Sequence, residues 1–260
     1  MLETLETITL ALIPGFILLD LVYRARQYKA PRSWRLRALV VTVAIFFLTG
    51  EIAALWGTAL EGISLFHLAQ YGTAVGVVVG ILVYELVHYW YHRLAHSWNW
   101  LWRAGHQMHH SAESLDAFGA YYLHPFDAAM FTTIGSLVFF PLLGVSLEAG
   151  VIAALFLTFN AMFQHANIKT PRWLGYLVQR PESHEVHHGK DVHRYNYADL
   201  PLWDMVFGTF VNPRLNAIDH EVGFYDGASA RIPEMLAGKD VSEPPTPETE
   251  KLLTTTTFQN

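Results

Sequence analysis

The chain has 260 residues and a formal net charge of −6, and 52% of its residues are hydrophobic whereas only 15% are charged. Soluble domains carry roughly 25% charged residues, so this composition favours a membrane protein over an ordinary soluble domain. The chain has no cysteine, which excludes disulfides, cysteine-ligated zinc, iron–sulfur clusters and thiol nucleophiles. Any bound metal must therefore be held by histidine, carboxylate or water.

Apolar blocks of a length suited to membrane spans recur along the first two thirds of the chain. They cover residues 8–23, 38–56, 67–87, 128–143 and 149–163. The last two are shorter and are separated by Gly144, so they form either a full hairpin or segments that dip only partway, and Pro141 leaves both options open. The sequence predicts an all-α, polytopic membrane helix bundle with about five spans and a cytoplasmic helical cap.

The distribution of basic residues predicts the orientation of the spans. Residues 24–37 contain six Lys and Arg residues and no acidic residue, and all 17 basic residues of the chain fall on the same side of the predicted spans. Because positive charge marks cytoplasmic loops, we expect the N-terminus outside and the cap in the cytoplasm. The short chain favours a bacterial inner membrane protein, with the endoplasmic reticulum as the alternative.

The chain divides into three expected regions. Residues 1–84 hold N-terminal spans, residues 85–212 form a catalytic region that includes the hairpin of spans, and residues 213–260 form a C-terminal segment. From about residue 240 this segment is rich in Pro, Thr and Glu without apolar periodicity, which predicts disorder.

Histidines cluster next to the predicted spans. The chain has 14 of them, and three motifs stand out: HxxxH (His92, His96), HxxHH (His106, His109, His110) and a second HxxHH (His184, His187, His188). Residues three and four apart share one face of a helix, so each motif should present its imidazoles to one side. One zinc ion takes about three or four protein ligands, so eight convergent imidazoles predict two metal ions near each other.

These motifs carry a resemblance to a known family. Together with Asn196-Tyr197 and the segment from Trp203 to Thr209, they resemble the fatty acid hydroxylase superfamily, which includes sterol desaturases and alkylglycerol monooxygenase. The resemblance covers roughly residues 85–210. It implies a non-haem diiron centre held almost wholly by histidine at the cytoplasmic membrane surface, where O2 and two electrons produce an oxidant that attacks an unactivated C–H bond. No catalytic residue is expected beyond the metal centre.

The resemblance also assigns roles to individual residues. It makes the eight motif histidines metal ligands and adds His165, at the end of the last span. It leaves His124, in an HPx(D/E)-like element, open between a metal ligand, a hydrogen-bond donor beside the ligands and a structural residue.

Other residues are expected around the ligands. Ligating imidazoles usually donate their second N–H to a carboxylate or carbonyl, so Glu85, Asp127 and Asp204 are candidate partners, and Asn196 belongs to the surrounding motif. His88 lies one turn before His92 and is either a further supporting group or a buried structural histidine.

The sequence predicts the reaction class but not the substrate. We expect hydroxylation, or else desaturation, of a fatty acyl, sterol or alkyl lipid. The cofactors would be two iron ions, with zinc as a possible substitute because imidazole suits both. The chain has no dinucleotide or haem motif, so a separate electron-transfer protein or reductant is expected, and no nucleic acid partner. The alternative is a zinc-dependent membrane hydrolase, for which Glu185 is the only obvious general base.

Overall fold

The computed structural model of the protein describes residues 2–214 and 221–245. All regular elements in those two ranges are helical. Within the described residues, the one pairing of β type is an isolated antiparallel bridge between Gly189 and Val222. The prediction of an all-α fold is confirmed.

Five of these helices are long and apolar enough to cross a membrane. They are α1 (Leu2–Val22), α2 (Trp34–Ala59), α3 (Thr73–Ser97), α6 (Pro125–Leu137) with its continuation η4 (Val138–Leu142), and α7 (Leu147–His165). The shortest of these segments has 18 residues, which corresponds to about 27 Å of α-helix. The five predicted spans are therefore present as helices, and the chain is a multi-pass membrane protein.

The third span begins later than the sequence predicted. Residues Leu68–Tyr71 form a short 3-10 turn, η1, and the α-helix starts only at Thr73. His67 and Gly72 have φ values of 51° and 85°. A right-handed helix cannot continue through positive φ, so the apolar stretch is divided before the span begins.

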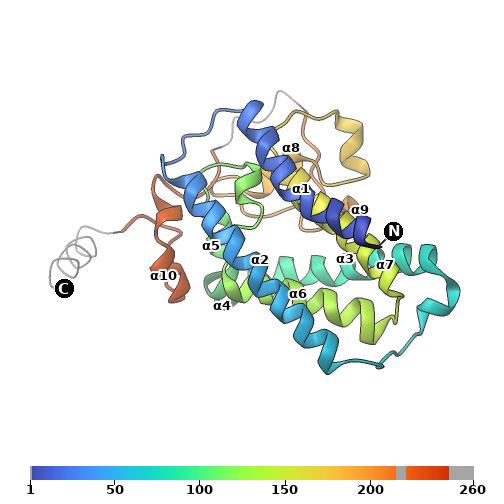
Figure 1. Cartoon of the computed structure of the whole chain (residues 1–260). Coiled ribbons are helices and arrows are strands. Elements are labelled where there is room, and N and C mark those ends of the chain that lie inside the picture. Colours follow the sequence, from blue (N-terminus) through green and yellow to red (C-terminus); the bar gives the residue numbers. More distant parts are fainter. Residues whose placement is uncertain (1, 215–220, 246–260) are drawn as a thin grey trace.

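The spans pack in pairs. α1 lies along α7, α2 lies along α6, and α3 contacts both α6 and α7 (Figure 1). Small residues permit the approach to α3, because a Cβ atom on Gly80 would lie 2.7 Å from the ring of Phe139, and one on Gly76 would lie 3.1 Å from the Cβ of Ala149. Such small-residue contacts bring helices close together in membranes.

The remaining elements are short. They are α4 (Asn99–Leu101), η2 (Trp102–His106), α5 (Gln107–His110), η3 (Ala117–Gly119), η5 (Arg172–Tyr176), α8 (Pro181–His187), α9 (Pro201–Phe207), η6 (Ala228–Ala230) and α10 (Ile232–Leu236). They form a cap over the C-terminal ends of α1, α3 and α7, since Asp20, His92 and Gln164 at these three ends bond to residues of this part of the chain.

Buried charges fasten the cap to the spans. At the end of α1, the carboxylate of Asp20 accepts backbone N–H bonds from Ala117 at 2.6 Å and from Asn167 at 3.0 Å. In the following loop, Arg26 forms an ion pair of 2.7 Å with Glu185 of α8. Part of the basic loop 24–37 thus braces the helix that carries the second HxxHH motif.

The prediction of disorder from about residue 240 falls mostly on residues 246–260, which lie outside the described residues. Before that point the chain packs against the first HxxHH region. The backbone N–H of Val241 donates to Gln107 at 3.1 Å, and Trp102 donates to the hydroxyl of Ser242 at 3.1 Å.

Candidate metal centre

Nine histidines converge beneath the cap in two groups. Group one contains His92, His96, His106, His110 and His187, and group two contains His109, His165, His184 and His188. Within each group the ligand atoms all lie within 4.8 Å of one another. The groups adjoin, because the rings of His110 and His188 stack with centroids 4.1 Å apart. The structure thus brings together nine of the ten histidines that the sequence singled out as ligands.

Each HxxHH motif serves both groups. His106 and His110 enter group one, whereas His109 enters group two; in the second motif, His184 and His188 enter group two and His187 enters group one. Residues four apart are nearly aligned on a helix, but adjacent residues differ by about 100°. The adjacent histidines therefore diverge, and the imidazoles of each motif, expected on one side of a helix, are divided between the two groups.

The ring nitrogens point at one another across short distances. In group one, the Nε2 atoms of His92 and His106 are 2.8 Å apart, and those of His106 and His110 are 3.2 Å apart. In group two, the Nε2 of His165 lies 3.2 Å from that of His109 and 3.2 Å from that of His184.

Hydrogen bonds at the opposite ring nitrogens show that the contact between His92 and His106 is not an ordinary hydrogen bond. The Nδ1 of His92 lies 2.6 Å from the carbonyl oxygen of Tyr197, and the Nδ1 of His106 lies 2.7 Å from Oδ2 of Asp127. An Nδ1 that faces an oxygen acceptor carries the proton, so the Nε2 of the same neutral ring presents a lone pair. Two lone pairs at 2.8 Å repel each other unless a cation lies between them.

The spacing matches what a bound metal ion requires. Metal–imidazole bonds of about 2.1 Å place neighbouring ligand nitrogens about 3.0 to 3.4 Å apart for bond angles between octahedral and tetrahedral values. Six Nε2 separations, three in each group, lie between 2.8 and 3.3 Å. The residues therefore fit two metal ions, one in each group, and an all-imidazole donor set suits iron, zinc, copper or nickel.

Burial favours the ligating form of these side chains. His110 and His187 are fully buried, and His109, His184 and His188 are at most 5% exposed. Loss of water around the rings, followed by repulsion from neighbouring imidazoles, lowers the pKa of all five well below the usual histidine value. Neutral imidazole is the form that binds metals.

Several oxygen acceptors outside the two groups orient the imidazole rings. Asp127 accepts from His106 and also from the hydroxyl of Tyr91 at 2.7 Å. The carbonyl oxygen of Tyr195 accepts from His187 at 2.7 Å, and that of Ala161 accepts from His165 at 2.7 Å. Such partners set the tautomer and direction of a ligand.

Two other predicted residues act through the backbone. Asp204 accepts N–H bonds from Tyr197 and Ala198 and so holds the carbonyl oxygen that faces His92. Asn196 bonds to the backbone of Ser183 and Val211. Both residues thereby fix the loop beside the two histidine groups.

The remaining predicted residues lie elsewhere. His124 caps α6, where its Nδ1 accepts the N–H of Phe126 at 3.0 Å, and it belongs to neither histidine group. Glu85 and His88 form a third polar group together with Asp199. His88 and Asp199 line the cavity described below, and the three residues belong to neither histidine group.

His193 was not singled out from the sequence. Its Nδ1 lies 3.1 Å from the Nδ1 of His110, so it contacts the outer edge of a group-one ligand. It belongs to a loop in which four non-glycine residues adopt positive φ: Asp191, His193, Tyr195 and Asn196. Such strain clusters at functional sites, but it is invisible in residue spacing, and only the proximity of His193 to the second HxxHH motif could have drawn attention to it.

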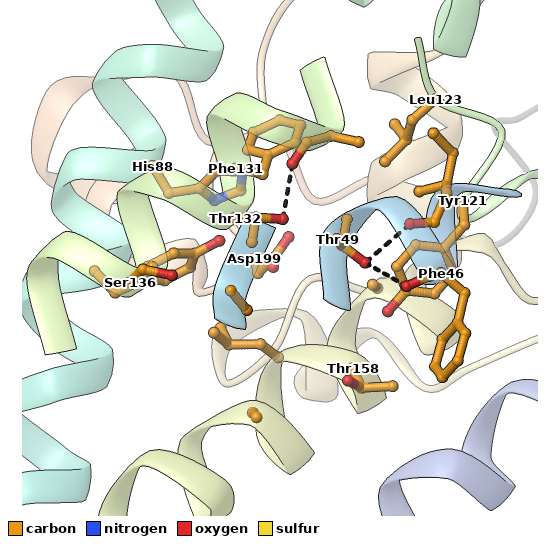
Figure 2. Close-up of a pocket in the computed structure, with 18 of the residues that line it drawn as sticks. Phe46, Thr49, His88, Tyr121, Leu123, Phe131, Thr132, Ser136, Thr158 and Asp199 are labelled. Atoms are coloured by element: carbon orange, nitrogen blue, oxygen red, sulfur yellow. Dashed lines mark hydrogen bonds between the residues drawn. The ribbon is translucent and has the colours of Figure 1, made fainter. Parts of the chain in front are cut away.

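A cavity of about 710 Å³ leads from the histidines into the spans. Its inner end is lined by His92, His106, His109, His165 and His184, and its walls come mainly from α2, α6 and α7. On α7 the lining runs from Leu147 to His165, which is about 27 Å along the helix. Figure 2 shows apolar side chains such as Phe46, Leu123 and Phe131 facing this space. The cavity is long and apolar enough for a hydrocarbon chain.

Comparison with known proteins identifies the family. A family model described as fatty acid hydroxylase matches residues 77–209, just over half of the chain. The chain belongs to the fatty acid hydroxylase family. No solved structure matches this family member.

Relatives of this family member carry the names of lipid-oxidising enzymes. It is 27% identical over 196 residues to sphinganine C4-monooxygenase 1 of Arabidopsis thaliana, covering 74% of this chain and 73% of the relative. It is 37% identical over 132 residues to human alkylglycerol monooxygenase, covering 47% of this chain and 28% of the relative. It is 31% identical over 166 residues to ornithine lipid hydroxylase OlsE of Rhizobium tropici, covering 62% and 50%. The predicted family is confirmed, and the relatives support an oxidative enzyme.

Proposed function

We propose that the protein is a membrane-bound non-haem diiron oxidoreductase that uses O2 and external electrons to hydroxylate a C–H bond of a lipid. Desaturation of the same kind of chain is the second form of this chemistry. The family and the names of the relatives support oxidation of a lipid. The iron ions, the use of O2 and the electron donor are our inference.

One observation carries the proposal. Two adjoining histidine groups lie at the inner end of an apolar cavity that follows the membrane spans. A lipid chain could lie in this cavity with one carbon beside the nine imidazoles, while its remainder stays among apolar side chains. A site for water-soluble substrates would have no need of apolar walls along the length of α7.

The residues of the chain would divide the work. His92, His96, His106, His110 and His187 would hold one iron ion, and His109, His165, His184 and His188 would hold the other. Two iron ions supply O2 activation and electron storage when bound. Asp127 and the carbonyl oxygens of Tyr195 and Tyr197 keep the ligand rings oriented, and burial of the ligands keeps bulk water away from the reacting carbon.

The hydrolase alternative has less support. Glu185 is the general base that a hydrolase would need. It forms an ion pair with Arg26 at 2.7 Å and accepts a hydrogen bond from the hydroxyl of Tyr28 at 3.0 Å, and neither partner belongs to a histidine group. A carboxylate held in this way is not positioned to activate a metal-bound water.

The orientation of the protein is part of the proposal. The basic residues of loop 24–37 lie at the same end of the spans as the cap, and positive charge favours the cytoplasmic side. We propose that the cap and its metal centre face the cytoplasm, most simply at the inner membrane of a bacterium, where a separate reductant can reach them.

Metal analysis of anaerobically purified protein, combined with Mössbauer spectroscopy after growth on iron-57, tests the proposal. We expect about two irons per chain as a coupled pair, and O2-dependent oxidation of a lipid once reductant is added. Stoichiometric zinc that iron cannot replace, with no O2 consumption after reduction, would instead favour the hydrolase.

A further inference from the structure

A third polar group lines the cavity close to the histidines. Glu85 and His88 of α3 lie with Asp199 of the loop before α9, and their ligand atoms are within 4.8 Å of one another. His88 and Asp199 line the cavity, and Figure 2 shows both facing the same space as Thr132. None of the three belongs to the nine histidines assigned to iron.

Hydrogen bonds hold this group rigidly. Oε2 of Glu85 accepts the backbone N–H of Asp199 at 2.9 Å and that of Leu200 at 3.1 Å. Oδ1 of Asp199 accepts from the side-chain amide of Gln164 at 2.9 Å, next to the proposed ligand His165. These bonds fix the position of the Asp199 carboxylate at the cavity wall.

Part of the group's hydrogen-bonding capacity is unused. Oε1 of Glu85 and Nδ1 of His88 have no hydrogen-bond partner among the described residues. Both side chains are buried, because Glu85 is 0% exposed and His88 is 7% exposed. The Nδ1 of His88 is 3.9 Å from Oε2 of Glu85, which is too long for a hydrogen bond. Buried polar groups are normally satisfied, and unpaired ones call for a missing partner.

The two carboxylates of the group share a single basic side chain, the imidazole of His88. No Lys or Arg is among the residues that line the cavity. Burial and the nearby Glu85 raise the pKa of Asp199 more than the neighbouring His88 lowers it, which reflects the cost of holding two carboxylates together beside a single imidazole. A donor carried by a ligand would relieve this cost, because hydrogen bonds to charged acceptors are stronger than neutral ones.

We propose that Asp199, with Glu85 and His88, binds a hydrogen-bond-donating polar group of the lipid substrate, a hydroxyl or a protonated amine. This inference rests on the proposed lipid oxidation and narrows its substrate class. The ring centroid of His88 is 5.6 Å from that of His92, a member of group one. A polar group bound here places a carbon only a few bonds away beside the metal centre, so the site selects the position of oxidation as well as the lipid.

Binding of matched C18 probes tests the inference. Octadecan-1-ol, octadecylamine and octadecyl methyl ether are titrated into the iron-loaded protein in detergent, and binding is followed by intrinsic tryptophan fluorescence. The ether cannot donate a hydrogen bond. A hydrogen bond to a charged group corresponds to a factor of about 10 or more in affinity, so we expect the alcohol, the amine or both to bind about tenfold more tightly than the ether. The stronger of the two identifies the donor.

Asp199→Asn should remove most of this preference, while the surface control Asp226→Asn should keep it. Iron content and thermal midpoint establish that each variant is folded. If Asp199→Asn does not fold, His88→Gln replaces it and should also weaken the preference. Equal binding of the ether, or an unchanged preference in the folded variant, overturns the inference. A third divalent ion per chain that disappears in Asp199→Asn also overturns it, because the group would then be a metal site.

The two proposals can fail separately. A preference for donors without any O2-dependent lipid oxidation would remove the proposed function but leave the binding site. Lipid oxidation without a preference for hydrogen-bond donors would leave the proposed function and remove the proposed binding site.

Discussion

Replacement of Asp127 by asparagine should weaken one metal site and spare the other. Asp127 is fully buried, accepts from Nδ1 of His106 at 2.7 Å and accepts from the hydroxyl of Tyr91 at 2.7 Å. An amide cannot accept both bonds. If its oxygen remains with Tyr91, its NH2 faces His106, and the ring must shift its proton to Nε2, which can then no longer bind a metal.

Removal of such outer partners lowers metal affinity by about 10- to 100-fold, or about 1.4 to 2.7 kcal/mol. Because Asp127 bonds to His106, a member of group one, the loss should fall on one of the two ions. Tyr91→Phe should have a smaller effect, since it leaves the carboxylate bonded to His106.

Anaerobic titration of the metal-free protein with ferrous iron, in competition with a chelator, measures both affinities. We expect one weakened and one unchanged binding step in Asp127→Asn, and two unchanged steps in the surface control Asp226→Asn. Two unchanged steps in Asp127→Asn would refute the idea that its carboxylate sets the tautomer of His106. Equal weakening of both steps would point to a general disturbance of the fold.

Three further perturbations follow from the geometry. His109→Ala and His187→Ala remove one ligand from each group, so each should abolish lipid oxidation and lower metal content without preventing membrane insertion; full activity on the true substrate would contradict the site. Ala154 lines the cavity, so Ala154→Phe should fill part of it and shift the substrate preference of the enzyme toward lipids with shorter chains. Product ratios from lipids of mixed chain length measure this preference, and an unaltered ratio would place the substrate elsewhere. Arg26→Ala breaks a 2.7 Å ion pair with Glu185. The side chain of Arg26 is only 15% exposed and that of Glu185 only 2%. Breaking such a pair lowers the free energy of unfolding by about 3–5 kcal/mol, so the thermal midpoint in detergent should fall. The midpoint should partly recover when Glu185→Gln is added. Equal midpoints for the wild type and Arg26→Ala would show that this ion pair does not stabilise the protein.

The sequence by itself determined the class of the protein. Apolar blocks separated by polar loops specify membrane helices through hydrophobicity alone, which is a local property of the chain. Even so, the start of α3 moved from residue 67 to Thr73, because positive φ at His67 and Gly72 depends on the turn that the chain makes there. The histidine motifs likewise carried the family resemblance, since their spacing is written in the chain.

The tertiary structure alone decided how the histidines are shared. Spacing groups His109 with His106 and His110, but the helix turns each residue by about 100°, and the neighbouring helices determine which metal group each ring enters. His165 joins group two because α7 ends against α8.

The third polar group was equally hidden. Glu85 and Asp199 are 114 positions apart, and no local pattern connects them. Sequence periodicity reports which side of a helix a residue occupies, whereas packing of distant segments decides what that side meets. For this protein, the first predicted a family of membrane lipid-oxidising enzymes and its candidate metal ligands, and the second divided nine of those histidines into two groups and placed their oxygen partners and the polar wall of the cavity.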